Sequence, residues 1–233
     1  MLTGEPTLFQ YRQGGCDITC IVTGNKWKQN TYIVTQASSV NTVIVDPGDC
    51  GELIIRQIEG AGAKVRRILL THPHHDHVGA AQLVSEHFGI ACELHTDDVR
   101  LLMHAPMYAL SFAKKKITAV SNFRPLAELA PVGEEPAMRA LHTPGHTKGS
   151  VCYLFDGFVF TGDTLLYEHV GRTDLPGASA EDIARSIGRL LDAACDETTI
   201  FPGHGRPWTI GAAKRWWRET GASPARYDNF SKL

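Results

Sequence analysis

A cluster of four metal-binding side chains follows directly on an apolar, β-type segment, residues 65–70. The cluster has the spacing His-x-His-x-Asp-His and consists of His72, His74, Asp76 and His77. A helix-type pattern begins at Val78, so the cluster is expected on a loop between a strand and a helix. Imidazole and carboxylate groups together suit zinc, iron or manganese. Four such groups are costly to bury without partners, which favours a metal site over the alternative, a solvated His-rich turn.

Three later loops present further ligand types, and each follows a predicted strand. They are His146 in Thr-Pro-Gly-His-Thr, Asp163 in Thr-Gly-Asp-Thr and His204 in Pro-Gly-His-Gly. Glycine or proline flanks each residue, which fixes the loop and lets the backbone approach closely. Each loop alone is a weak signal, because a histidine after Pro-Gly is more often an ordinary turn residue. Together with the first cluster, and in this order, the three loops indicate a metal centre.

The rest of the chain alternates strand-type and helix-type segments without a linker between two halves. We therefore predict one domain over residues 1–233, with two sheets packed face to face and helices outside. A weakly patterned stretch, 105–136, is the candidate lid or substrate-facing insert, and 221–233 is expected to be an exposed tail. Strands are expected at 18–22, 31–34, 42–45, 65–70, 90–94, 137–141, 150–155, 157–160 and 198–201. Helices are expected at 52–60, 78–88, 97–104, 108–117, 179–191 and 210–218.

Composition excludes several classes of protein. The net charge of −2 comes without a clustered basic face, so no nucleic-acid partner is expected. No stretch is long and apolar enough for a membrane span, and no signal peptide is visible. The six cysteines contain no Cys-x-x-Cys pair and are interpreted as reduced, which favours a cytoplasmic protein. The terminal Ser231-Lys232-Leu233 would be a peroxisomal address in a eukaryote and a coincidence in a bacterium, and both interpretations stay open.

With these motifs in this order, the chain resembles the metallo-β-lactamase-fold hydrolases. The resemblance extends from Val-Ile-Val-Asp-Pro-Gly at 43–48 to Pro-Gly-His-Gly at 202–205. The short glyoxalase II-like, or hydroxyacylglutathione hydrolase-like, branch is the most similar, because Gly-Arg-Thr-Asp-Leu-Pro-Gly occurs at 171–177. The resemblance implies an α+β fold, a four-layer αββα sandwich.

The resemblance also implies how two divalent metal ions would be bound. His72, His74 and His146 would bind one ion, Asp76, His77 and His204 the other, and Asp163 would bridge them. Zinc is expected, with iron or manganese as alternatives. Water between two such cations loses a proton near neutral pH and becomes the nucleophile, and Asp76 or Asp163 could accept that proton. His75 is expected to be a neighbour, and five further histidines match no ligand position: His87, His95, His104, His142 and His169.

The expected function is hydrolysis of a small-molecule thioester of the hydroxyacyl-thiol kind. Lactone hydrolysis is an alternative for the same centre. A persulfide dioxygenase-like oxygenase would need one iron and three ligands, and a binding protein with a relic site would not need an intact ligand set. Only 29 residues follow His204, so the usual glutathione-binding region is absent or replaced. The sequence does not indicate an oligomeric state.

Residues around the metal motifs allow two roles each. Asp46 could cap a turn or orient a metal-bound histidine, and both roles stay open. Arg172 and Asp174 are expected to form an ion pair that holds their loop, with contact to substrate as the alternative. Trp208, Trp216 and Trp217 are expected to pack in the core, with a pocket lining as the alternative.

Overall fold

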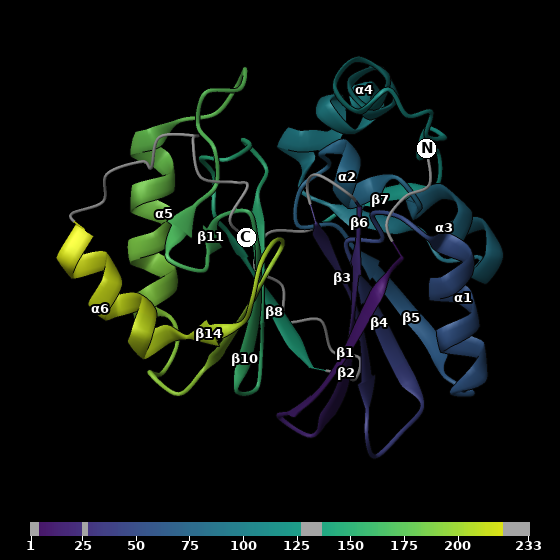
Figure 1. The fold of residues 1–233 in the computed structure, drawn as a ribbon, viewed down its shortest axis with the longest axis horizontal. Coiled ribbons are helices and arrows are strands. Elements are labelled where there is room, and N and C mark those ends of the chain that lie inside the picture. The colour runs from purple at the N-terminus through teal and green to yellow at the C-terminus, as the bar shows by residue number, and fades with distance from the viewer. Residues whose placement is uncertain (1–4, 25–27, 127–136, 221–233) are drawn as a thin grey trace.

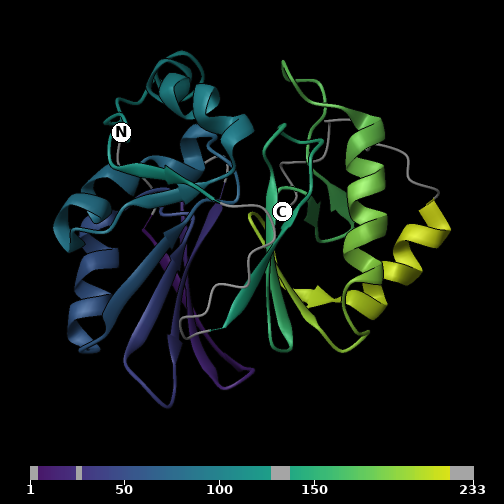
Figure 2. The same ribbon diagram turned by 180° about the vertical axis from the view of Figure 1, so that it is seen from behind.

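A computed structural model describes residues 5–24, 28–126 and 137–220. Its elements form four layers, with two sheets face to face and helices on the outer face of each sheet (Figure 1). The view from behind shows the same layers (Figure 2). The predicted αββα sandwich is therefore confirmed. Three larger helices cover the first sheet: α1 (Gly51–Gly60), α3 (Ala81–Phe88) and α4 (Val99–Tyr108). Two cover the second: α5 (Ala180–Asp192) and α6 (Ile210–Thr220).

The first sheet has seven strands in chain order. They are β1 (Thr7–Gln13), β2 (Cys16–Thr23), β3 (Gln29–Gln36), β4 (Asn41–Val45), β5 (Lys64–Leu69), β6 (Cys92–Leu94) and β7 (Phe123–Pro125). The strands β1 to β4 pair antiparallel, whereas β4 to β7 pair parallel. Parallel pairing needs crossover connections, which α1, α3 and α4 provide. The sequence patterns did not predict β1, which lies at the sheet edge with most of its side chains exposed.

The second sheet has five strands in the order β14-β13-β10-β9-β8. They are β8 (Met138–His142), β9 (Val151–Phe155), β10 (Phe158–Gly162), β13 (Thr199–Pro202) and β14 (Trp208–Thr209). A separate small pair consists of β11 (Leu165–Leu166) and β12 (His169–Val170). The strands β8, β10 and β13 all run in the same direction, because β8 and β10 both pair antiparallel with β9 and β10 pairs parallel with β13. Their carboxyl ends therefore meet at one edge.

Three apolar clusters hold the four layers together. The cluster between the sheets is rich in aromatic rings, including Tyr32, Tyr153, Phe158, Phe160 and Phe201, all at most 2% exposed. A second cluster packs the first sheet against α1, α3 and α4, and a third packs the second sheet against α5 and α6. Trp208 belongs to the third cluster, as expected for a core residue, and the partly buried Trp216 and Trp217 pack against it.

Two helix boundaries differ from the sequence prediction. The predicted helix 78–88 is two helices, α2 (His75–Val78) and α3, so part of the metal motif is itself helical. The break occurs where Ala80 donates its N–H to the Pro47 carbonyl (3.0 Å) and where a side chain on Gly79 would collide with the Gly48 carbonyl. The chain thus bends to stay against the turn after β4.

The helices predicted at 97–104 and 108–117 form one continuous segment. A 3₁₀ turn (Thr96–Asp98) leads into α4, which continues as a π-helical turn (Ala109–Ala113). His95 caps the start, because its Nδ1 accepts the Asp97 N–H (3.3 Å). Ser179 caps α5, with its hydroxyl accepting the Asp182 N–H (3.1 Å).

Hydrogen bonds join the two halves close to the predicted metal motifs. Val151 donates its N–H to the Thr71 carbonyl (2.9 Å), and Asn30 donates its N–H to the Gly203 carbonyl (2.8 Å). The Tyr153 hydroxyl donates to the Leu70 carbonyl (2.9 Å). None of the helices in the described ranges combines the length and apolar character needed to cross a bilayer. The tail 221–233, with its Ser231-Lys232-Leu233 end, and residues 127–136 of the candidate insert lie outside the described residues.

Candidate metal centre

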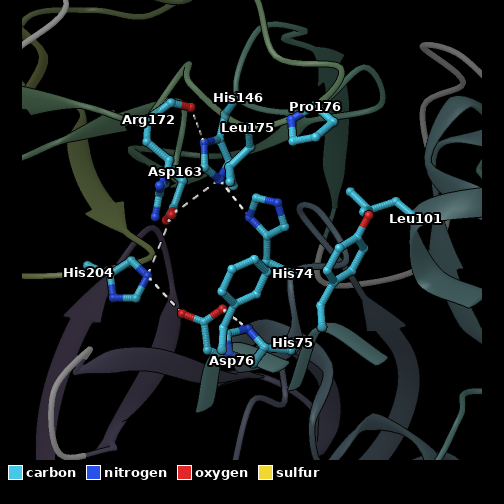
Figure 3. A pocket seen from close by; sticks show the side chains of 12 residues that line it. His74, His75, Asp76, Leu101, His146, Asp163, Arg172, Leu175, Pro176 and His204 are labelled. Carbon is cyan, nitrogen blue, oxygen red and sulfur yellow. Dashed lines mark hydrogen bonds and ion pairs between the residues drawn. The ribbon is translucent and has the colours of Figure 1, made fainter. Parts of the chain in front are cut away.

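The structure brings all seven predicted ligands together at the junction of the two sheets. Figure 3 shows five of them: His74, Asp76, His146, Asp163 and His204. Each follows the carboxyl end of a strand, where loops from both halves meet. Two groups of three ligand atoms converge within 4.8 Å of one another. We call His72, His74 and His146 the triple-imidazole cluster, and Asp76, His77 and His204 the carboxylate cluster.

In the triple-imidazole cluster, three rings point their nitrogens at a common space. His146 Nε2 lies 2.9 Å from His74 Nδ1. The His72 ring stands nearly perpendicular to both other rings, with centroids 4.7 Å away in each case. Tetrahedral coordination with metal–nitrogen bonds of about 2.0–2.1 Å puts neighbouring ligand nitrogens roughly 3.3 Å apart. The observed spacing is therefore close to that of a ligand set around one small cation.

The carboxylate cluster has a similar spacing but includes a charged ligand. His77 Nε2 lies 3.2 Å from His204 Nε2, and His204 Nε2 lies 3.5 Å from Asp76 Oδ2. His77 and His204 are buried, whereas the Asp76 side chain is 23% exposed and borders the cavity above. A cation placed here would meet one carboxylate and two imidazoles.

Asp163 lies between the two clusters. Its Oδ2 is 3.5 Å from both His146 Nε2 and His204 Nε2, and its Oδ1 is 3.5 Å from His77 Nε2. Two buried atoms at this point, Asp163 Oδ1 and His72 Nε2, have no hydrogen-bond partner within the described part of the chain. Orphaned polar atoms of this kind are costly in a protein interior, and a cation would satisfy both. The residues present therefore fit divalent metal ions.

Hydrogen bonds at the opposite ring nitrogens orient the ligands. His77 Nδ1 bonds to Asp46 Oδ2 (2.9 Å), His146 Nδ1 to the Arg172 carbonyl (2.8 Å) and His204 Nδ1 to the Lys28 carbonyl (2.9 Å). Because a carbonyl or carboxylate oxygen only accepts, Nδ1 carries the proton in each ring. The Nε2 lone pair is then directed at the centre, because a hydrogen bond at Nδ1 fixes both the tautomer and the orientation of a metal-binding histidine.

Asp46 combines the two roles that the sequence left open. Its backbone adopts a left-handed turn conformation (φ 49°) after β4, which aspartate tolerates better than most residues. Its Oδ1 accepts the Thr71 N–H (2.7 Å) and its Oδ2 accepts the Thr71 hydroxyl (2.6 Å) as well as the His77 ring. Both oxygens are thus engaged, so Asp46 supports the ligands and is not one of them.

The two clusters differ in their protonation. Burial lowers the pKa of all three imidazoles in the triple-imidazole cluster, that of His74 to about 3, so they are neutral at pH 7. Burial also acts to lower the pKa of His77, but the carboxylates of Asp163, Asp46 and Asp76 outweigh it and raise that pKa to about 9. At neutral pH in the metal-free protein, His77 therefore carries a second proton besides the one on Nδ1, and a metal ion must displace this second proton.

The two carboxylates stay ionised despite burial. Desolvation acts to raise the pKa of Asp163, but His204, His77 and His146 overcome it and lower the pKa below its usual value. The pKa of Asp76 is also lowered against desolvation, first by the hydrogen bond from His75 and then by His77 and His204. The sequence placed His75 beside the ligands, and its Nδ1 lies 3.3 Å from Asp76 Oδ1.

Glycines let backbone pass directly over the ligands. A side chain on Gly203 would come within 2.5 Å of Asp163 Oδ1 and 2.7 Å of His77 Cε1. A side chain on Gly171 would collide with the Asp163 carbonyl. The Pro-Gly-His-Gly and Gly-Arg-Thr-Asp motifs therefore need glycine for close approach at the centre.

The loop that carries His146 is anchored on the other half of the molecule by Asp98. This carboxylate, 2% exposed, accepts the Thr147 hydroxyl (2.6 Å) and the Gly149 N–H (3.0 Å). Burial raises its pKa. Asp98 directly precedes α4, so one residue couples this ligand loop to the helix beside the site. Sequence reasoning missed it, because an Asp-Asp pair before a helix is an ordinary start signal.

A cavity of about 220 Å³ opens over both clusters. Five of the seven ligands, His74, Asp76, His146, Asp163 and His204, form its floor, whereas Leu101, Tyr108, Phe112, Leu175 and Pro176 form its walls. The floor is therefore polar and the walls apolar. The Arg172 Nε and Nη2 bind Asp174 (3.0 and 2.9 Å), so the expected ion pair is present. Arg172 also lines the cavity, and its contact with substrate stays a prediction. Tyr108 and Phe112 lie within 105–136, the stretch predicted as a lid or substrate-facing insert, and Leu175 and Pro176 lie within the 171–177 motif, whereas Leu101 carried no sequence signal.

The five remaining histidines take no part in either cluster. His87 bonds to Glu59 (2.9 Å) and His104 to the Arg100 carbonyl (2.7 Å) on the surface. His95 and His142 stack on each other, with centroids 3.9 Å apart. The rings are nearly parallel, 8° apart, and together with Asp97 they offer three ligand atoms within 4.8 Å of one another, apart from the two clusters. The six cysteines, all in the described part of the chain, are free thiols.

Comparison with known proteins defines the class. The family model of the metallo-beta-lactamase superfamily matches residues 24–204, and the chain belongs to this superfamily. An uncharacterised protein of Mycobacterium tuberculosis is 36% identical over 203 residues, which cover 80% of this chain and 90% of that protein. Hydroxyacylglutathione hydrolase GloC of Haemophilus influenzae is 33% identical over 203 residues, covering 84% and 94%.

A solved structure supports the same class. The protein TTHA1623, crystallised in a di-iron-bound form, is 34% identical, with a TM-score of 0.75 over 83% of this chain and 96% of that one. The ligand clusters and the superfamily membership together define a metal-dependent hydrolase that uses divalent metal ions.

Proposed function

We propose that this chain is a binuclear metal-dependent hydrolase that cleaves a small-molecule thioester, of the hydroxyacyl-thiol kind. The triple-imidazole cluster would hold one ion, the carboxylate cluster the second, and Asp163 would be shared. The observation that carries the proposal is the position of Asp163, with one oxygen 3.5 Å from a nitrogen of each cluster. Two cations held here would polarise a carbonyl and acidify a bound water.

The residues of the chain supply the remaining steps. Asp76 and Asp163 border the cavity and are ionised at neutral pH, because their pKa values are lowered. Either carboxylate can therefore accept the proton of an attacking water at Oδ1 or Oδ2, provided that the water lies within hydrogen-bond reach. Asp46, Arg172 and Lys28 keep the histidine rings oriented while this happens.

The protonation of the site favours a leaving group that departs as an anion. Before the attack neither cavity carboxylate carries a proton, because both pKa values are lowered, so the only proton that either could later donate is the one taken from the water. A thiol has a pKa of about 8.5, so its thiolate leaves more readily than an amine or an alkoxide that needs a proton donor. This supports a thioester over an amide. The name of the GloC relative, a hydroxyacylglutathione hydrolase, points in the same direction.

The first test counts metal and compares substrates. Elemental analysis of the purified protein should give two metal ions per chain, with zinc expected and iron or manganese as alternatives. A panel of thioesters, lactones and persulfides should show hydrolysis of thioesters. One iron per chain with oxidation of a persulfide would contradict the proposal. Cleavage of lactones without cleavage of thioesters would show that the substrate is a lactone and not a thioester.

A matched pair of variants tests the ligand assignment. His74→Ala removes a ring whose Nδ1 faces His146, whereas His75→Ala removes its neighbour, whose Nδ1 lies 3.3 Å from Asp76 Oδ1. The first variant should abolish hydrolysis and lower bound metal, and the second should change both by less than about threefold, since it removes no ligand. Equal losses in the two variants would make the assignment wrong.

A further inference from the structure

The walls of the cavity are apolar whereas its floor is polar, and this difference bears on the kind of substrate that the cavity can bind. Leu101, Tyr108 and Phe112 come from α4 and the π-helical turn after it, and Leu175 and Pro176 come from the loop before α5. Figure 3 shows Leu175 and Pro176 near His146, and Leu101 on the far side of His74 from His204. Apolar side chains thus flank the triple-imidazole cluster from both halves of the molecule.

The spacing along the helix separates these residues from the core. Leu101, Tyr108 and Phe112 recur at intervals of seven and four residues, which places them on one face of a helix. Leu102, Ala105 and Ala109 form the buried face. The cavity face is therefore not needed for packing, yet it is apolar. The Tyr108 and Phe112 rings stack with centroids 6.0 Å apart, and the Phe112 side chain remains 60% exposed.

The segment that carries this face is held in place. Lys115 donates its N–H to the Ala109 carbonyl (3.2 Å), which closes the π-helical turn. The Lys115 ammonium then pairs with Asp49 (2.6 Å), three residues after Asp46, which orients His77. Short π-helical turns occur frequently at functional sites. The wall is therefore built onto the same turn that supports the metal ligands.

The charge of the lining argues against a strongly anionic occupant of the walled space. Among the described residues that line the cavity, Arg172 carries the only permanent positive charge, and Asp174 binds it through two hydrogen bonds. A thiol carrier with carboxylates or phosphates would be matched by several cations. Apolar walls instead match hydrocarbon, because burying it is favourable in proportion to area.

We infer that the walled space receives the acyl chain of the thioester, and that the natural substrate carries an apolar acyl group of roughly four to eight carbons. This inference rests on the proposed thioester hydrolysis and deepens it. An apolar cavity of about 150 Å³ binds a benzene ring, so a cavity of about 220 Å³ has room for such a chain beside the reacting carbonyl. Phe112 and Leu175 then determine chain-length specificity.

The test holds the thiol constant and varies the acyl group. The metal-loaded protein is assayed with acetyl, butyryl and hexanoyl thioesters of N-acetylcysteamine, a small neutral thiol. A fully buried methylene is worth about fourfold, so four methylenes in a half-open cavity should raise kcat/KM for hexanoyl over acetyl at least about tenfold. Equal values for the three substrates would overturn the inference.

Variants on one helical turn assign the effect to the wall. Phe112→Ala should reduce the hexanoyl-to-acetyl ratio at least about threefold, because the ring covers the chain. Phe112→Leu should restore most of it. Leu110→Ala is the matched control, since Leu110 is 52% exposed and does not line the cavity. Its ratio should equal that of the unmodified protein. An unchanged ratio in Phe112→Ala would contradict the assignment.

A binding measurement separates this inference from the proposed function. Calorimetric titration of the metal-loaded protein with acetate and with hexanoate measures the affinity of the acyl product without any turnover. Hexanoate should bind at least about tenfold more tightly, and Phe112→Ala should remove most of the difference. If no thioester is hydrolysed, the proposed function fails whatever this result. If thioesters are hydrolysed but hexanoate binds no better than acetate, the acyl-chain inference alone fails.

Discussion

The two ligand clusters lie side by side but would bind a cation in different ways. The triple-imidazole cluster is uncharged at neutral pH, because burial lowers the pKa of all three histidines. The carboxylate cluster contains an ionised Asp76 and a His77 that keeps its proton up to about pH 9. One cluster is therefore ready for a metal, and the other must release a proton first. The difference comes from where the carboxylates lie, not from the number of histidines.

The largest expected effect comes from removing the residue that both clusters share. Asp163→Asn keeps the shape of the side chain but removes the charge, so both ions lose a ligand. We expect at least about a 10³-fold loss of activity, since a metal ion contributes several kcal/mol to such a reaction. Metal content should fall at both clusters. Asp156→Asn, in an exposed hairpin turn, is the control. Loss of one ion alone would show that Asp163 belongs to a single cluster.

The second prediction concerns pH. Below pH 9, metal affinity of the carboxylate cluster should fall about tenfold per pH unit, because a proton competes at His77. The triple-imidazole cluster should keep its affinity down to below pH 6, since its rings are already neutral. Calorimetric metal titrations between pH 6 and 9 measure both. If metal affinity changed with pH in the same way at both clusters, the proposed difference between the clusters would be wrong.

The raised pKa of His77 has the opposite consequence for the folding stability of the metal-free protein, which it increases at low pH. A histidine with a raised pKa stabilises the fold fully below its unfolded pKa, 6.5, and the contribution is lost as the pH rises through about 9. Histidines with lowered pKa values act in the other sense and destabilise the fold as the pH falls below 6.5. Urea unfolding after chelation, across this pH range, measures the balance.

The third prediction addresses the support of one ring. Asp46→Asn should weaken metal binding at the carboxylate cluster about 10- to 100-fold, the usual cost of losing a carboxylate that orients a metal-binding histidine. It should also lower the pKa of His77, because one of the three carboxylates that raise it is gone. Proton competition should therefore shift to lower pH. Asp49→Asn, in the same turn but paired with Lys115, is the control. An equal effect on both clusters would contradict a local role.

The smallest expected effect comes from the anchor of the His146 loop. Asp98→Ala leaves the Thr147 hydroxyl and the Gly149 N–H buried without their acceptor, which should cost about 1–3 kcal/mol of unfolding free energy. Activity should fall only a few-fold, through the triple-imidazole cluster. Urea unfolding and metal content are measured beside Asp97→Ala, whose side chain is largely exposed. Loss of metal from the carboxylate cluster would contradict the assignment of Asp98 as an anchor of the His146 loop.

The sequence predicted the parts of this molecule that depend on short-range pattern. The four ligands at 72–77 share one contiguous motif, and His146, Asp163 and His204 each follow a strand within a glycine- or proline-flanked loop. The layered fold followed from strands that alternate with helices. These features can be predicted without knowing which distant segments are in contact, because each depends on only a few neighbouring residues.

What the sequence did not predict depends on contacts between distant segments. The Lys28 carbonyl that orients His204 leaves no trace in side-chain identity. Asp98 looks like any helix-start acid until the loop of Thr147 is seen against it. Phe112 lies where periodicity weakens, because a π-helical turn follows α4 and shifts the pattern away from the α-helical repeat. It lies within 105–136, the stretch predicted as a lid or substrate-facing insert, but its exact position over the cavity depends on tertiary packing.

The division of the ligands between the halves has a consequence for synthesis. His72 to His77 leave the ribosome together, whereas His146 comes 69 positions later and His204 later still. Since chains emerge and begin to fold from the amino terminus, the nascent first half carries an incomplete ligand set without its closing partners. Firm metal uptake would therefore belong to the end of biosynthesis, when the second half docks, and a cation bound by residues of both halves would resist their separation.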